Sequence, residues 1–136
     1  MTVRSLDYIR SLVEKYSAYI NAPTTFQPTY GFSQDGARPH IEVNNKGYHY
    51  VVVERGKELK RITTNDIDEL LYHVFKGITF QISTEFELEN RVEHQDSRRI
   101  FFKKQEELLG YIKESWKTRK EQEHNAILRF RPFRDK

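Results

Sequence analysis

The strongest constraint on the fold is a change in the spacing of apolar residues near position 65. Between residues 40 and 62 the chain is rich in β-branched and aromatic side chains, most densely in the run Tyr48–Val53. Such a run is typical of β-strands. From Ile67 onwards apolar residues recur at steps of three and four, the period of an amphipathic helix. Two periods in separate blocks predict an α+β fold.

The extended block predicts a small antiparallel β-meander of three to four strands over residues 30–62. Asn45–Gly47 and Arg55–Lys57 supply the turns. Residues 21–37 contain two prolines and two glycines, and seventeen structureless residues are long for a compact domain. Tyr30–Phe32 is therefore predicted as an extra edge strand that turns at Asp35–Gly36. Side chains alternate across a sheet, so the middle strand should present Tyr48, Tyr50 and Val52 on one face and His49, Val51 and Val53 on the other.

An N-terminal helix is predicted over residues 3–20, with Thr2 or Ser5 as its N-cap. Its apolar residues fall on one face: Leu6, Ile9, Val13, Tyr16 and Ile20.

A C-terminal set of about four helices is predicted over residues 65–128. The stripe that begins at Ile67 is the clearest of them, and Gly77 is expected to end it. The last helix is expected to be anchored by Trp116 and Ile127. We expect the meander to pack with these helices and with the N-terminal one.

The length of 136 residues fits a single domain over residues 1–136. The chain has no cysteine, which excludes a disulfide scaffold and suits a reducing compartment. Charged residues interrupt the N-terminal segment, so it resembles neither a signal peptide nor a membrane span. We therefore expect a cytoplasmic protein that makes no membrane contact.

No catalytic, cofactor or metal site is predicted. The five histidines are interpreted as solvated surface residues, and the chain has no nucleophile elbow and no glycine-rich phosphate loop. A magnesium-dependent phosphodiesterase could be drawn from Asp35, Glu42 and Glu58–Lys60, but such triplets arise by chance in a chain that is 32% charged. The sequence favours a protein that is not an enzyme.

Basic charge is concentrated at the C-terminus. Residues 117–136 hold seven Lys or Arg against three acids, a net of +4, whereas the other residues sum to −1. A nucleic-acid-binding accessory protein that uses this basic helix and tail is the alternative function. The preferred interpretation is that Phe130 and Phe133 pack the tail onto the body while its arginines stay solvated. Nucleic acid is therefore an unlikely partner.

Glu85, Glu89 and Glu93 are spaced four residues apart, with Arg91 among them. Like charges at this spacing repel on a helix. Ion pairs with Arg98–Arg99 or Lys103–Lys104 would make the acids a structural network, and an exposed acidic ridge would make them a partner-binding site. Arg91, Tyr48 and Tyr50 are candidate partner-binding residues as well.

Several segments together are similar to the immunity protein 63 family of bacterial polymorphic toxin systems. They are Arg38–Val43, Gly47–Val52, Glu54–Gly56, Asp66–Leu71, Glu85–Leu88, Arg91–Glu93 and Arg98–Phe102. The resemblance implies a small cytoplasmic protein that neutralises a cognate toxin domain by stoichiometric occlusion, without catalytic residues or cofactors. It implies neither the identity of the toxin, nor the face that binds it, nor the oligomeric state.

Overall fold

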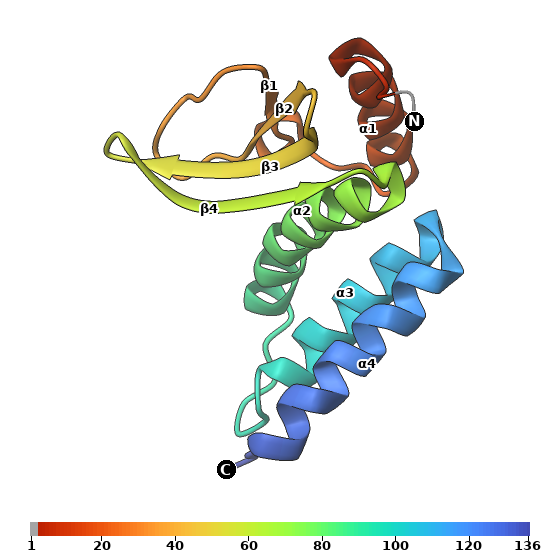
Figure 1. The fold of residues 1–136 in the computed structure, drawn as a ribbon. Coiled ribbons are helices and arrows are strands. Elements are labelled where there is room, and N and C mark those ends of the chain that lie inside the picture. Colours follow the sequence, from red (N-terminus) through yellow and green to blue (C-terminus); the bar gives the residue numbers. More distant parts are fainter. Residues whose placement is uncertain (1–2) are drawn as a thin grey trace. The chain divides into compact units, whose positions relative to one another are not determined.

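The computed structural model describes residues 3–136, which form four α-helices and a four-stranded sheet (Figure 1). The chain divides into two compact units, Met1–Phe75 and Lys76–Lys136, with the boundary inside helix α2. The elements are α1 (Leu6–Tyr19), the 3-10 helix η1 (Thr24–Phe26), β1 (Thr29–Tyr30), β2 (His40–Asn44), β3 (Gly47–Glu54), β4 (Lys57–Thr64), α2 (Ile67–Glu89), α3 (Arg98–Ile112) and α4 (Glu114–Phe130). This order confirms the predicted α+β class, and the single domain stays a prediction.

Helix α1 begins after a side-chain cap. The Ser5 hydroxyl accepts a hydrogen bond from the Tyr8 backbone N–H at 3.2 Å, which satisfies one of the free donors of the first turn. The other predicted cap, Thr2, lies outside the described residues. Ile9 and Val13 are fully buried, so the predicted apolar face is the face that packs.

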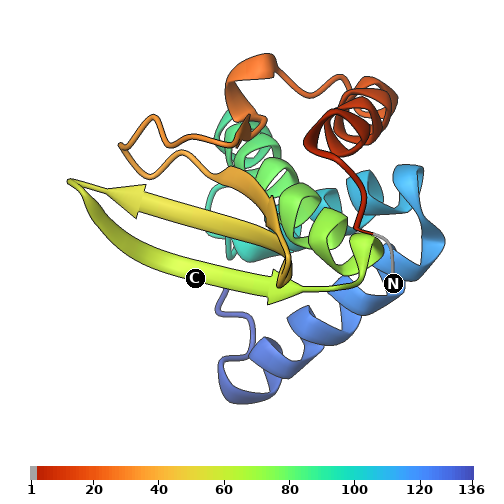
Figure 2. The ribbon, with the colours of Figure 1, turned by 45° about the horizontal axis from the view of Figure 1, so that its top comes forward.

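The strands lie in the order β1-β2-β3-β4, and Figure 2 shows the long strands β3 and β4 side by side. The pairs β2–β3 and β3–β4 are antiparallel, which confirms the meander. Strand β1 runs parallel to β2 instead. The turn predicted at Asp35–Gly36 does not make a β1–β2 hairpin, because the long loop returns the chain to the starting end of β1. There the Thr29 N–H donates to the Pro39 carbonyl and the Gly31 N–H to the Ile41 carbonyl.

A β-bulge in β4 decides which side chains share a face of the sheet. Lys60 and Glu58 oppose neighbouring residues of β3, which leaves Leu59 as the extra residue. In a regular strand, residues three apart lie on opposite faces. The extra residue therefore brings Glu58 and Arg61 to the same face and puts Lys60 on the other.

Helix α2 continues through Gly77, so the break predicted there is wrong. Three helices follow the sheet, where about four were expected. A glycine inside a helix costs about 1 kcal/mol relative to alanine. Phe75 and Ile78 on either side of it are almost fully buried, and this burial outweighs the cost.

Helices α3 and α4 form an antiparallel hairpin joined by Lys113, whose backbone is extended (Figure 1). Leu109 and Trp116 are buried, whereas Ile127 is 43% exposed. Trp116 therefore anchors α4 as predicted, and Ile127 does so only in part. Within residues 3–136 no helix combines the length and the apolar character needed to span a membrane.

Candidate functional site

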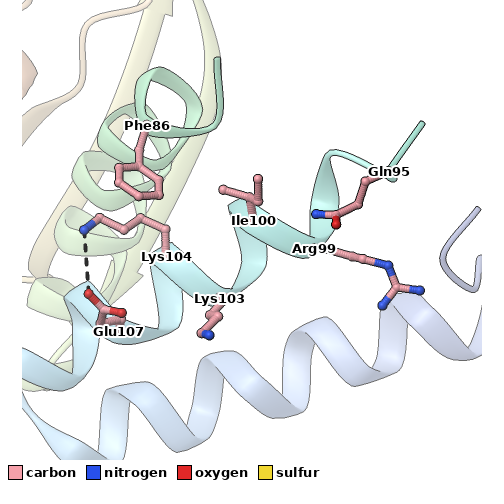
Figure 3. Close-up of a pocket in the computed structure, with 7 residues that line it drawn as sticks. All are labelled: Phe86, Gln95, Arg99, Ile100, Lys103, Lys104 and Glu107. Carbon is pink, nitrogen blue, oxygen red and sulfur yellow. Dashed lines mark ion pairs between the residues drawn. The ribbon is translucent and has the colours of Figure 1, made fainter. Parts of the chain in front are cut away.

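A groove lies between the end of α2 and the first half of α3 (Figure 3). Its volume is about 470 Å³. Two apolar side chains, three cations, one carboxylate and one amide line it: Phe86, Gln95, Arg99, Ile100, Lys103, Lys104 and Glu107. These seven residues are called the α2–α3 groove below. All of them belong to the unit Lys76–Lys136.

Two lysines of the groove keep cationic charge available to a partner. The Lys104 ammonium lies 4.4 Å from the centre of the Phe86 ring and 3.6 Å from a Glu107 carboxylate oxygen. The Lys104 side chain is 22% exposed, so its charge stays in contact with solvent despite both interactions. Lys103 is exposed and makes no ion pair with any described residue.

Glu85 and Glu89 lie exposed on α2, beside Leu88, which is 59% exposed. These three residues are called the acidic strip. Across the described chain neither carboxylate makes an ion pair, so the network interpretation is wrong for both. The cations proposed as their partners are engaged elsewhere or free: Arg98 binds Asp96, Arg99 binds Asp135, Lys104 binds Glu107, and Lys103 is unpaired.

Glu93 does not belong to this strip, which corrects the predicted ridge of three acids. Helix α2 ends at Glu89, and the Asn90 side-chain amide donates to the Phe86 carbonyl at 2.9 Å, satisfying a free acceptor of the last turn. Glu93 follows in the loop, where its carboxylate lies 3.3 Å from the ring of His94.

Arg91 is paired within the chain. Its guanidinium donates to both oxygens of Glu87, at 2.7 and 3.0 Å. Glu87 is 5% exposed, and this bidentate pair compensates the buried carboxylate. The pair lowers the pKa of the Glu87 carboxyl and raises that of Arg91.

Tyr48 and Tyr50 lie in the core, only 3% and 6% exposed. The Tyr48 hydroxyl accepts a hydrogen bond from the Arg4 backbone N–H at 2.8 Å. Burial raises the pKa of the Tyr50 hydroxyl to about 12. Both tyrosines lie on the predicted face of β3, but that face is covered, so they offer no contact area to a partner.

A charged network covers the opposite face of the sheet, and sequence reasoning did not find it. Arg61 on β4 reaches across β3 to the Glu42 carboxylate on β2 at 3.1 Å, and it also pairs with Glu58 at 2.8 Å. Glu42 receives a further contact of 2.7 Å from the His40 ring. These bonds lower the pKa of the Glu42 carboxyl, the His40 contact contributing most. The bulge that aligns Glu58 with Arg61 has no sequence signature.

The magnesium site considered from the sequence is not assembled. Glu58 and Lys60 lie on opposite faces of β4, and Glu42 is bound by Arg61. Asp35 accepts a hydrogen bond from the Gly56 N–H at 3.2 Å. The described residues contain no cluster of three or more His, Asp or Glu side chains placed to hold a metal ion.

The C-terminal tail folds back onto the start of α3. Arg98 donates to the carbonyls of Arg131 and Pro132, at 2.8 and 2.9 Å. Phe133 packs against Phe102, with ring centres 6.3 Å apart, whereas Phe130 is 88% exposed. The predicted packing of the tail is therefore confirmed for Phe133 and wrong for Phe130.

Asp135 reinforces this attachment. Its carboxylate accepts from the Arg99 guanidinium at 2.9 Å and from the Asp96 backbone N–H at 2.8 Å. The Arg99 guanidinium also lies 4.2 Å from the centre of the Phe133 ring. Arg99, at the edge of the α2–α3 groove, is thereby fixed in place.

Three histidines are buried, so their predicted place at the surface is wrong for His40, His49 and His124. The His124 ring stacks on Phe102 with centres 3.8 Å apart, and its Nδ1 lies 2.7 Å from a Glu106 carboxylate oxygen. Burial lowers the pKa of His124 to about 4.

Lys120, counted as part of the basic C-terminal segment, is also buried, and it pairs with Glu123 at 3.0 Å. The exposed positive charge of that segment is smaller than its composition suggested.

Residues 3–136 thus bring together two exposed acids, the unpaired Lys103 and apolar side chains on α2 and α3, a mixture suited to protein contact. The described fold is that of a small α+β protein with such a surface. The profile of a family described as Immunity protein 63 matches residues 44–126, more than half of the chain, and the chain belongs to this family. The matched region includes the acidic strip and the α2–α3 groove. No curated protein and no solved structure matches the chain.

Proposed function

We propose that this protein neutralises a cognate bacterial toxin in the cytoplasm by binding it stoichiometrically and occluding it. Membership of the Immunity protein 63 family supports a role in immunity. Occlusion requires a rigid contact surface and no catalytic residue of its own. The acidic strip and its surroundings on α2 are the surface that we assign to this contact.

We assign the toxin contact to the acidic strip because its two carboxylates make no ion pair with any described residue. Glu85 and Glu89 stand one helical turn apart, where like charges repel by a few tenths of a kcal/mol. No cation within the described residues offsets this repulsion. A cation of a partner would do so, and Leu88 beside them would lose its 59% exposure in the same contact.

The proposed contact also bears on the class of toxin. An inhibitor of a strongly basic nuclease tends to be acidic over its whole surface, whereas residues 1–116 of this chain carry a net charge of −1. The cognate toxin is therefore not a strongly basic nuclease, or the acidic strip alone imitates nucleic acid.

The test uses the toxin domain encoded directly upstream of this chain. Protection is measured by growth after the toxin is expressed with and without this protein. Binding is measured by calorimetry at two salt concentrations, using a catalytically inactive toxin variant. Removing both charges with Glu85→Gln and Glu89→Gln should weaken binding about tenfold at low salt and reduce its dependence on salt.

A matched control removes two exposed acids from the other unit, with Glu14→Gln and Glu54→Gln. It should bind as the wild type does. Salt-insensitive binding by the wild type would show that the acidic strip makes no contact, and absence of both binding and protection would refute the proposed function.

A further inference from the structure

The acidic strip and the α2–α3 groove are neighbours on one surface. On α2, Glu85 comes one residue before Phe86 and Glu89 comes three residues after it. Phe86 is part of the groove. Residues three apart lie on the same side of a helix. The acids therefore form one row beside Phe86 on α2, and Lys103 and Lys104 form a second row on α3, with the Lys104 ammonium 4.4 Å from the centre of the Phe86 ring.

The two rows are complementary in charge, yet they do not pair within the chain. Glu85, Glu89 and Lys103 are free of ion pairs among the described residues. Lys104 has only the 3.6 Å contact to Glu107. Three charged side chains with no partner on one small surface remain available for intermolecular pairing.

Apolar side chains are available in the same place. Leu88 is 59% exposed on the acidic side, and Tyr111 is 61% exposed one turn beyond Glu107 on α3. Phe86 and Ile100 line the groove between them. The surface thus combines an apolar centre with opposite charges on its two sides.

We propose that a second copy of this chain binds this surface, so that the acidic strip of each copy meets the α2–α3 groove of the other. The two copies are related by a two-fold axis that lies in the interface, parallel to the two rows and midway between them. The acidic row of each copy then faces the lysine row of its partner. Glu85 and Glu89 of one copy then pair with Lys103 and Lys104 of its partner, and each contact forms twice.

Charge complementarity selects this occupant over others. Nucleic acid would meet the lysines, but the carboxylates of the acidic strip and of Glu107 would repel its phosphates. A toxin could contact the same acidic strip, in which case it would compete with the second copy and convert a homodimer into a heterodimer. The dimer itself does not depend on the proposed function.

The experiment is a charge swap followed by sedimentation velocity at about 0.1 mM protein. The wild type should be dimeric, and its dissociation constant should rise with salt. The double variants Lys103→Glu with Lys104→Glu, and Glu85→Lys with Glu89→Lys, should each weaken association about tenfold or more, because like charges then face each other. The quadruple variant should restore the dimer.

A control with Lys15→Glu and Lys46→Glu changes the net charge as Lys103→Glu with Lys104→Glu does, but in the other unit, and it should stay dimeric. Fluorescence of Trp116, the only tryptophan, checks that every variant is folded. The proposal is overturned if the wild type is monomeric, if the double variants remain dimeric, or if the folded quadruple variant does not regain the dimer. If the wild type is monomeric and the variants of the α2–α3 groove lose only the ability to bind the toxin, this surface binds the toxin instead of a second copy.

Discussion

The buried imidazole of His124 should make the stability of this protein fall as the pH drops below 7. The ring is 2% exposed, and burial lowers its pKa from 6.5 to about 4. Charged groups face it from three helices: Glu106 on α3, Lys120 and Glu123 on α4, and Lys76 on α2. Both nearby lysines disfavour a protonated ring.

The size of the effect follows from the difference in proton binding. Between pH 6.5 and pH 4 the unfolded chain binds a proton at His124 that the folded chain does not bind, so stability must fall as the pH falls. From pH 7.0 to pH 5.5 the loss is about 1.2 kcal/mol, and below pH 4 it reaches roughly 3 kcal/mol. Burial raises the pKa of Glu106, so proton uptake by that carboxyl offsets part of the loss at lower pH. The window above pH 5.5 is therefore the best one for the test.

Urea unfolding followed by Trp116 fluorescence at the two pH values measures this loss. His124→Gln removes the titrating ring and should lose about 1.2 kcal/mol less than the wild type between pH 7.0 and pH 5.5. Comparing the two proteins cancels the contribution of His49, whose pKa burial also lowers. His94→Gln alters an exposed ring and should keep the wild-type loss. Equal losses in wild type and His124→Gln would refute the reasoning.

Three further predictions concern the sheet and the tail. Gly47→Ala should lower the free energy of unfolding, measured by urea titration, by about 2 kcal/mol, because φ is +119° and a Cβ would lie 2.6 Å from the Thr64 carbonyl oxygen. Gly36→Ala, with open space around the added Cβ, should lower it by less. Arg61→Ala removes the bridge between Glu42 and Glu58 and should cost about 1 kcal/mol at low salt and less at high salt, so a salt-independent loss of thermal stability would contradict the ion-pair account. Asp135→Asn weakens the attachment of the tail to Arg99 and should speed tryptic cleavage after Arg134, which mass spectrometry of limited digests would detect; an unchanged cleavage rate would show that the other tail contacts suffice.

Local patterns were enough to predict most of the fold. The apolar face of α1, the meander and the stripe from Ile67 all follow from side-chain spacing, because burying one face is what stabilises a helix or strand. The prediction of a break at Gly77 was wrong, since tertiary packing on both sides of a glycine outweighs its local cost. The parallel pairing of β1 was missed as well, because the direction of β1 relative to β2 is set by a nine-residue loop, which has no turn motif that a sequence would reveal.

The candidate site depended much more on the tertiary structure. The sequence placed Glu85 and Glu89 on one helix but could not show that Glu93 lies past its end, nor that Tyr48 and Tyr50 are covered. Charge is visible in a sequence, whereas pairing depends on which distant residues come within about 4 Å. The Arg99–Asp135 and Arg61–Glu42 pairs are of this long-range kind, and the sequence offers no means of telling them from the charges of Glu85, Glu89 and Lys103, which make no ion pair among the described residues.

The sequence by itself therefore determined the α+β class, the order of its elements, the absence of cysteine chemistry and the resemblance to an immunity-protein family. These properties depend on composition and on spacing along the chain. Only the tertiary structure decided which tyrosines and histidines are buried, which charges neutralise each other, and which of the charges on α2 and α3 make no ion pair among the described residues. The reason is physical: burial and ion pairing depend on separations in space between residues that are far apart in the chain.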